Sequence, residues 1–118
     1  VLKLGAHVAP LGLAFYRGEE FPKRFRNTVF WAEHGSWNRS QKSGYRVMMG
    51  KLDDDHERII SNEPFVEGWL EDQNNWGRPV DILNMPDGSI LISAKEFRIF
   101  CQQMILNVLR QNSNIVFQ

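Results

Sequence analysis

Apolar and polar residues alternate over short stretches between residues 11 and 93, with the period of two that is typical of half-buried β-strands. Polar segments that contain glycine or proline separate these stretches, and Pro86-Asp87-Gly88 is the clearest turn signal. Pro64 indicates a strand at a sheet edge. The pattern predicts strands over 11–18, 28–35, 44–53, 63–70, 80–85 and 89–93.

The order of these strands predicts the architecture. Four short antiparallel strands followed by the hairpin of a new sheet have the rhythm of one β-propeller blade and half of the next. We therefore expect a mainly β chain, a partial β-propeller of about one and a half antiparallel blades over residues 1–93. A fragment of a β-sandwich fits the same spacing nearly as well, and the pattern leaves that alternative open.

The C-terminal segment has a different character, because it contains neither glycine nor proline after Ser93. Ser93 and Glu96 match a capping box, the signature of a helix start. We therefore predict a C-terminal helix over 94–110, within a divergent tail that spans 94–118. A frameshift near Ser93 would produce such a tail. Apolar side chains recur there at helical spacing, at Phe97, Phe100, Met104 and Val108.

Charge and composition exclude several classes of function. The chain has 118 residues, and its 14 Lys and Arg balance its 14 Asp and Glu. Without a basic block, we expect no nucleic-acid partner. No apolar run is long enough for a membrane span and no signal-peptide pattern opens the chain. The single cysteine, Cys101, excludes an internal disulfide. Since the first residue is Val1, we expect a fragment or a processed product.

Two short motifs gather groups that could bind a ligand. EHGSWNRS (33–40) combines an acid, an imidazole, an indole, an amide and a guanidinium at the end of a predicted strand. In the second motif, Gly77 permits close backbone approach and Pro79 stiffens the chain after Arg78. A guanidinium fixed in this way suits a planar carboxylate, which it can bind with two hydrogen bonds. A surface arginine on a loop is an equally good interpretation.

The histidines and acids give no catalytic set by themselves. His7 and His34 could each donate to a ligand or move a proton, but a loop histidine bonded to the backbone is the simpler interpretation. A nucleophilic triad of Glu33, His34 and Ser36 is disfavoured, because neighbouring strand residues point to opposite faces. The acidic run over 53–56 lies on one turn and cannot converge on one ion, so we predict no metal site.

These motifs occur in a familiar order. The chain resembles the C-terminal part of the soluble sugar dehydrogenases that use pyrroloquinoline quinone, from about residue 5 to 93. It is most similar to the glucose/sorbosone dehydrogenase family, in its L-sorbosone dehydrogenase-like branch. The resemblance rests on AHVAPLGLAFYRGEEFP, VFWAEHGSWNRS, GYRV, FVEGWL and WGRPVDILNMPDGSILIS.

The resemblance implies a fold and an activity. The family fold is a six-bladed β-propeller, with the quinone over the central channel and calcium helping to bind and polarise it. A histidine takes the proton from a sugar hydroxyl while hydride moves to the quinone. The resemblance therefore implies oxidation of an aldose or a sorbosone-type sugar, in a periplasmic or secreted enzyme.

Only part of that site is expected in this chain. The resemblance implies that Arg78 and His7 contact the cofactor, together with Arg39 or Asn38. It implies no catalytic residue here, because the catalytic histidine and the calcium ligands of the family lie in earlier blades. We therefore expect this chain alone to be inactive, not to hold pyrroloquinoline quinone or calcium, and to self-associate through open blade edges.

Two other classes of function stay open. One is a non-catalytic β-propeller remnant or binding module, whose helical tail would be an association surface. The other is a calcium-dependent lactonase-like propeller, which shares the rhythm of the blades. That second class needs several inward-pointing acids, and Asp81 alone is too few.

Overall fold

Nine β-strands and one short 3-10 helix form the described part of the chain. The computed structural model describes residues 2–95 and the backbone of residues 101–106. Within these residues no helix has the length and apolar character to cross a bilayer. In chain order the elements are β1 (Pro10–Phe15), η1 (Lys23–Phe25), β2 (Thr28–Glu33), β3 (Arg46–Leu52), β4 (Ile59–Val66), β5 (Leu70–Glu71), β6 (Asn74–Asn75), β7 (Arg78–Asn84), β8 (Ile90–Lys95) and β9 (Cys101–Leu106).

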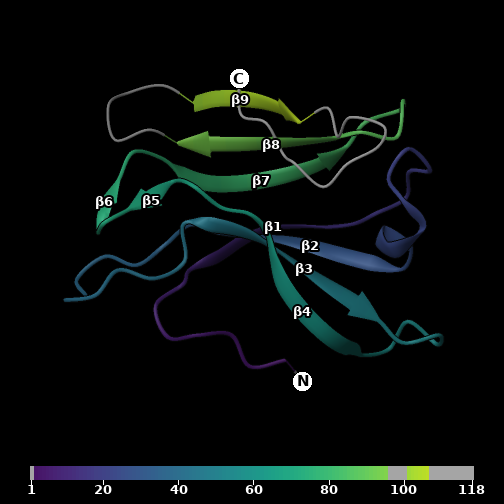
Figure 1. Ribbon diagram of the computed structural model, residues 1–118, viewed down its shortest axis with the longest axis horizontal. Helices are drawn as coiled ribbons and strands as arrows, with labels where there is room; N and C mark the ends of the chain where they lie inside the picture. Colours follow the sequence, from purple (N-terminus) through teal and green to yellow (C-terminus); the bar gives the residue numbers. More distant parts are fainter. Residues whose placement is uncertain (1, 96–100, 107–118) are drawn as a thin grey trace.

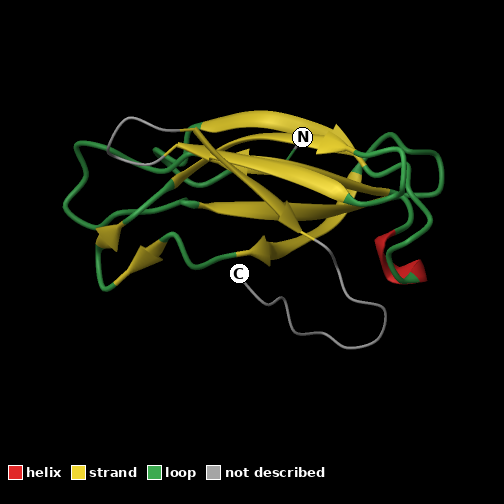
Figure 2. Ribbon diagram, turned by 90° about the horizontal axis from the view of Figure 1, so that it is seen from above, coloured by secondary structure: helices red, strands yellow, loops and turns green. Residues whose placement is uncertain are grey.

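Two antiparallel sheets hold most of these strands (Figure 1). The first has the order β1-β2-β3-β4 and the second the order β7-β8-β9, so each strand pairs with its neighbour in sequence. A small β5-β6 ribbon connects them, and η1 lies at the opposite end of the sheets (Figure 2). The prediction of a mainly β chain with antiparallel sheets is confirmed, and the second sheet contains a third strand, β9, beyond the predicted hairpin.

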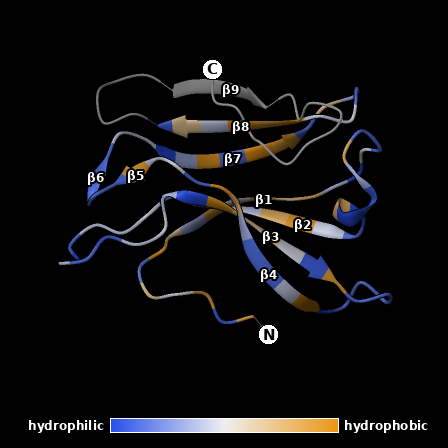
Figure 3. Ribbon diagram, viewed as in Figure 1, coloured by the Kyte–Doolittle hydropathy of each residue, from blue (hydrophilic) through white to orange (hydrophobic). Residues whose placement is uncertain are grey.

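The main core lies between the two sheets. Phe30, Ala32 and Met49 of the first sheet share one buried cluster with Ile82 and Ile92 of the second. A smaller cluster around Val29 and Trp31 covers the other face of the first sheet. β2 is therefore buried on both faces, which explains why its six residues are all buried. Hydrophobic residues lie mainly in the strands of the two larger sheets, whereas β6 is hydrophilic (Figure 3).

Polar contacts close the end of the core near η1. The Tyr16 hydroxyl donates to the carbonyl oxygen of Gly88 at 2.7 Å and accepts from the Phe21 amide at 3.0 Å. The Asn84 side chain donates to the Phe15 carbonyl at 2.9 Å and accepts from the Arg17 amide at 3.2 Å. These bonds join the end of β1 to the hairpin of the second sheet.

The structure corrects two sequence predictions. β4 begins at Ile59 and ends at Val66, earlier than the predicted 63–70, because its polar residues lie at an exposed edge. The prediction of a C-terminal helix over 94–110 is wrong for those residues of this range that the structure describes. Ala94 and Lys95 end β8, and residues 101–106 form β9, which pairs with β8 along its whole length. Residues 96–100 and 107–118 lie outside the described part.

Candidate functional site

The residues predicted to contact a cofactor lie together at one end of the two sheets. We call this the loop end; it is where β2 and β8 finish and β1, β3 and β7 begin. Arg78 is the first residue of β7, and Asn38 and Arg39 lie in the loop between β2 and β3. His7 comes just before β1. The antiparallel pairing of the strands therefore gathers groups that are up to 71 positions apart (78 − 7) in the sequence.

Arg78 holds the loop that follows β2. Its guanidinium donates to the carbonyl oxygens of His34, Gly35 and Ser36 at 3.4, 3.0 and 3.4 Å. The same group lies over the Tyr45 ring, 4.8 Å from its centroid, which is a cation–π distance. Arg78 is half-buried in this position. These hydrogen bonds fix the backbone of the loop. They use guanidinium N–H donors that the sequence analysis expected to bind a carboxylate.

Arg39, Asn38 and His7 lie on the surface of the loop end. One terminal nitrogen of Arg39 donates to the Ala6 carbonyl at 2.9 Å and to the Ser43 hydroxyl at 2.8 Å. This ties the loop to the segment that carries His7. Asn38 and His7 are exposed and have left-handed backbones, with φ of 57° and 62°. The strained backbone at these two positions is consistent with a fixed loop shape.

His34 and Lys95 complete the cluster. The sequence analysis weighed His34 as a ligand donor but preferred a histidine bonded to the backbone, and it did not name Lys95. The Nδ1 atom of His34 lies 3.0 Å from the carbonyl oxygen of Pro79. Because a carbonyl only accepts, Nδ1 carries the proton and Nε2 is left as an acceptor. Lys95 is directly opposite Arg78 in the β7-β8 register. Counting residue pairs back from the Pro86-Asp87-Gly88 turn would place Lys95 opposite Pro79, and only the register shift between Pro79 and Asp81 brings it opposite Arg78.

The environment keeps the His34 imidazole neutral. Burial lowers the pKa of His34 below its ordinary value, and the hydrogen bond to Pro79 opposes that shift. The charges of Arg78 and Lys95 lower the pKa further, because two cations disfavour a third charge. The site therefore places the positive charges of Arg78 and Lys95 near the neutral His34 imidazole, which can donate one hydrogen bond and accept another.

Further bonds fix the shape of the loop between β2 and β3. Ser36 and Ser43 are bonded to one another twice, through the Ser36 amide at 2.8 Å and the Ser36 hydroxyl at 2.9 Å. The Lys42 amine donates to the Asn75 side chain of β6 at 2.8 Å. Trp37 projects from this braced loop and is 82% exposed. The loop end thus presents an indole and several cations on a backbone with little freedom.

The chemistry available at the loop end is the binding of an anion. Arg39 and Lys95 are exposed cations of the loop end, and Lys95 pairs across β7-β8 with half-buried Arg78. The nearby carboxylate of Glu33 is buried and paired with Arg46 at 2.8 Å, so it does not cancel them. Within the described residues no three His, Cys, Asp or Glu side chains come together as a metal site would require.

Three comparisons relate the chain to known proteins. A family model described as TrAA12-like matches residues 1–68. An uncharacterized protein from Borreliella burgdorferi is 42% identical over 109 residues, which cover 88% of this chain and 29% of the relative. The holo form of the pyranose dehydrogenase PQQ domain from Coprinopsis cinerea has a TM-score of 0.49 and 22% identity, over 76% of this chain and 24% of that one. The chain thus spans less than a third of the length of the relatives it matches.

Proposed function

The chain belongs to the TrAA12-like family, and from this premise we propose that it forms part of the cofactor-binding face of a quinone-dependent dehydrogenase. The cofactor in this proposal is pyrroloquinoline quinone, and the substrate is an aldose or a sorbosone-type sugar. The resemblance of the HGSWNRS and WGRPVDILN motifs to the glucose/sorbosone dehydrogenases supports this assignment.

One observation carries the proposal. The loop end holds two exposed cations: Arg39, on a loop that is bonded to its surroundings at several points, and Lys95, which lies opposite Arg78 on β8. Pyrroloquinoline quinone is a planar molecule with carboxylate groups, and such groups prefer fixed cations and N–H donors. The indole of Trp37 could stack on a planar ring from the same loop.

The residues of the loop end fit the acidic part of this cofactor. When bound, the quinone would supply the hydride acceptor, and Arg39 and Lys95 would hold its carboxylates. The neutral His34 ring can accept a hydrogen bond through Nε2, while Arg78 keeps the loop in place. We assign no catalytic residue and no calcium ligand to the described part of the chain.

The sugar site, the cellular location and the activity are proposals about a larger protein that would contain this chain. We propose that the sugar binds beside the quinone, on the side that other blades complete. A periplasmic or secreted location is part of the same proposal, as the resemblance implies. The 118-residue chain alone should not oxidise a sugar, because the resemblance implies that the catalytic histidine and the calcium ligands lie in other blades.

The test is a titration of the 118-residue chain with pyrroloquinoline quinone, followed by tryptophan fluorescence. The sequence alone predicts that this fragment does not hold the quinone, but the cations of the loop end lead us to propose weak saturable binding. Binding by Lys95→Gln and Arg39→Gln should be about tenfold weaker. Lys23→Gln is the matched control, because Lys23 is an exposed lysine in η1 at the opposite end of the sheets. Arg78→Ala is unsuitable here, because it would release the loop itself.

The alternative is a non-catalytic binding module or remnant of a propeller. That alternative predicts no saturable quinone binding by the wild-type chain, or equal binding by the wild type and all three variants. Either result would contradict the proposed function.

A further inference from the structure

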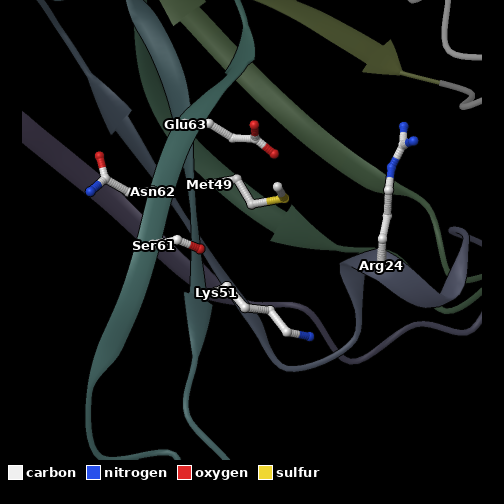
Figure 4. Close-up of a pocket in the computed structure, with 6 residues that line it drawn as sticks. All are labelled: Arg24, Met49, Lys51, Ser61, Asn62 and Glu63. Atoms are coloured by element: carbon white, nitrogen blue, oxygen red, sulfur yellow. The ribbon is translucent and has the colours of Figure 1, made fainter.

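A second candidate site lies at the other end of the first sheet, away from the loop end. It is a cavity of about 230 Å³ between η1 and the β3-β4 pair, and Arg24, Met49, Lys51, Ser61, Asn62 and Glu63 line it (Figure 4). The volume is below the range of about 300–1,000 Å³ that is usual for drug-sized ligands. The cavity therefore suits a molecule of only a few to about a dozen heavy atoms.

Strand register places the side chains of this cavity on one face. Met49 is opposite Glu63 and Lys51 is opposite Ser61, so these four project from the same side of the β3-β4 pair. Asn62 points to the other side and lines the cavity with its backbone (Figure 4). Arg24 reaches the cavity from η1, across from the sheet (Figure 4).

The cavity presents both signs of charge. Arg24 and Lys51 supply cations and Glu63 supplies a carboxylate, and the Met49 thioether lies between Glu63 and Lys51 (Figure 4). Among the described residues, ion pairs form only at Arg46, so none of these three charges is paired with an opposite charge. Lys51 and Glu63 are diagonal neighbours across the two strands, about 7–8 Å apart at the backbone.

Two of the side chains are held where a ligand would need them. The Lys51 amine donates to the carbonyl oxygen of Arg26, and the ammonium group has further N–H donors for a ligand. The Arg24 guanidinium lies 4.7 Å from the centroid of the Phe25 ring. Met49, only 8% exposed, forms the apolar floor.

We propose that this cavity binds a small zwitterion, namely a free α-amino acid with a short apolar side chain. The ligand carboxylate would bind Lys51 and Arg24, its ammonium group would bind Glu63, and its side chain would lie on Met49. A simple anion such as phosphate is disfavoured because the Glu63 carboxylate repels it. A simple amine is disfavoured in the same way by the two cations.

Three probes with one side chain test this assignment by calorimetry on the 118-residue chain. L-leucine carries both charges, N-acetyl-L-leucine lacks the ammonium group, and L-leucinamide lacks the carboxylate. We expect L-leucine to bind about fivefold to tenfold more tightly than either of the others, since each loses one charged contact. Equal binding of the three probes, or no measurable binding of L-leucine, would overturn the proposal.

Two variants assign each contact. Glu63→Gln should remove the preference for L-leucine over N-acetyl-L-leucine while keeping the preference over L-leucinamide. Lys51→Gln should have the opposite effect. Glu57→Gln is the matched control, because Glu57 is an exposed acid on the β3-β4 connection that does not line the cavity. If either cavity variant keeps both preferences, the proposed contact is wrong.

Discussion

At the scale of single residues, the bonds of His34 and Arg78 run in opposite directions across the two sheets. Arg78 of the second sheet donates to the backbone of residues 34–36, and the His34 ring of the first sheet donates to the Pro79 carbonyl. Each sheet therefore supplies both a donor and an acceptor to the other. This reciprocal pair joins the ends of β2 and β7, and Arg78 and Lys95 place two positive charges near the His34 ring.

Stability should fall in mild acid because of His34. The pKa of His34 is lowered in the folded chain by burial and by Arg78 and Lys95, whereas the unfolded chain should titrate near the ordinary value of about 6.5. As the pH falls through that value, the unfolded state binds a proton that the folded state resists, so the free energy of unfolding decreases. We expect the midpoint temperature of thermal unfolding to decrease as the pH is lowered from about 7 to about 5. In His34→Gln this temperature should decrease less.

His56→Gln is the control for this experiment, since His56 lies exposed on the turn between β3 and β4. It should keep the pH dependence of the wild type. A His34→Gln variant with the same pH dependence as the wild type would show that His34 does not cause it.

The sequence motifs named residues of the candidate site but not their contacts. Through their resemblance to the sugar dehydrogenases, these motifs singled out Arg78, Arg39, Asn38 and His7, which lie at one end of the sheets. Whether these residues contact a cofactor stays a prediction, and the motifs left the loop contacts open. The motifs could not show that Arg78 bonds three carbonyls, because that contact depends on the shape of a loop 42–44 positions away, where Gly35 has a φ of 97°. Local sequence carries no information on such a contact.

At the scale of elements, β1 and β7 form the seam between the sheets. Polar bonds close both of its ends, with Arg78 and His34 at the loop end and Asn84 and Tyr16 at the other. In the middle, the backbones approach closely at Gly12. A methyl group there would lie 2.5 Å from the Asp81 Cα atom and 2.9 Å from the Val80 carbonyl oxygen. The lack of a side chain at Gly12 is therefore what allows the two strands to pack.

Gly12→Ala should be strongly destabilising for this reason. The added methyl group meets backbone atoms, which cannot rotate away, so β1 and β7 must separate. We expect a loss of ~2 kcal/mol or more in the free energy of unfolding, measured by urea denaturation. Gly5→Ala is the control, because the nearest atom to its added methyl group is a Val8 methyl carbon at 3.4 Å. Equal stability of the two variants would contradict the close approach.

The errors in predicting elements have one physical cause, which is pairing with a neighbouring strand. The helical spacing of apolar residues after Ser93 is a local signal, but β8 continues its buried alternation through Ala94 and then pairs with β9. Ser93 is accordingly a strand residue and not a helix cap. Hydrogen bonds to an existing edge outweigh a modest helical preference, and the sequence window alone does not contain the edge.

At the scale of the whole molecule, the two outer strands of the first sheet, β1 and β4, expose different kinds of side chain. The edge strand β4 exposes Ser61, Asn62, Glu63 and Pro64, and polar residues with a proline protect an edge from further pairing. β1 instead exposes three large apolar side chains in alternation, with Leu11, Leu13 and Phe15 at 50%, 57% and 48% exposure. An apolar stripe of this kind is unusual on a surface that has no partner. We therefore expect the chain to self-associate through this stripe of β1 rather than through the β4 edge.

Sedimentation velocity over a range of concentrations tests this expectation. Leu13→Lys places a charge in the centre of the stripe and removes apolar area that a second copy would bury. Because burying one leucine contributes about 1.5–3 kcal/mol, the association constant should fall by at least about tenfold. Ile60→Lys is matched in chemistry and lies on β4, where Ile60 is 65% exposed, so it should leave association unchanged. A wild-type chain that stays monomeric at every concentration, or a larger effect of Ile60→Lys, would show that the β1 stripe is not the contact surface.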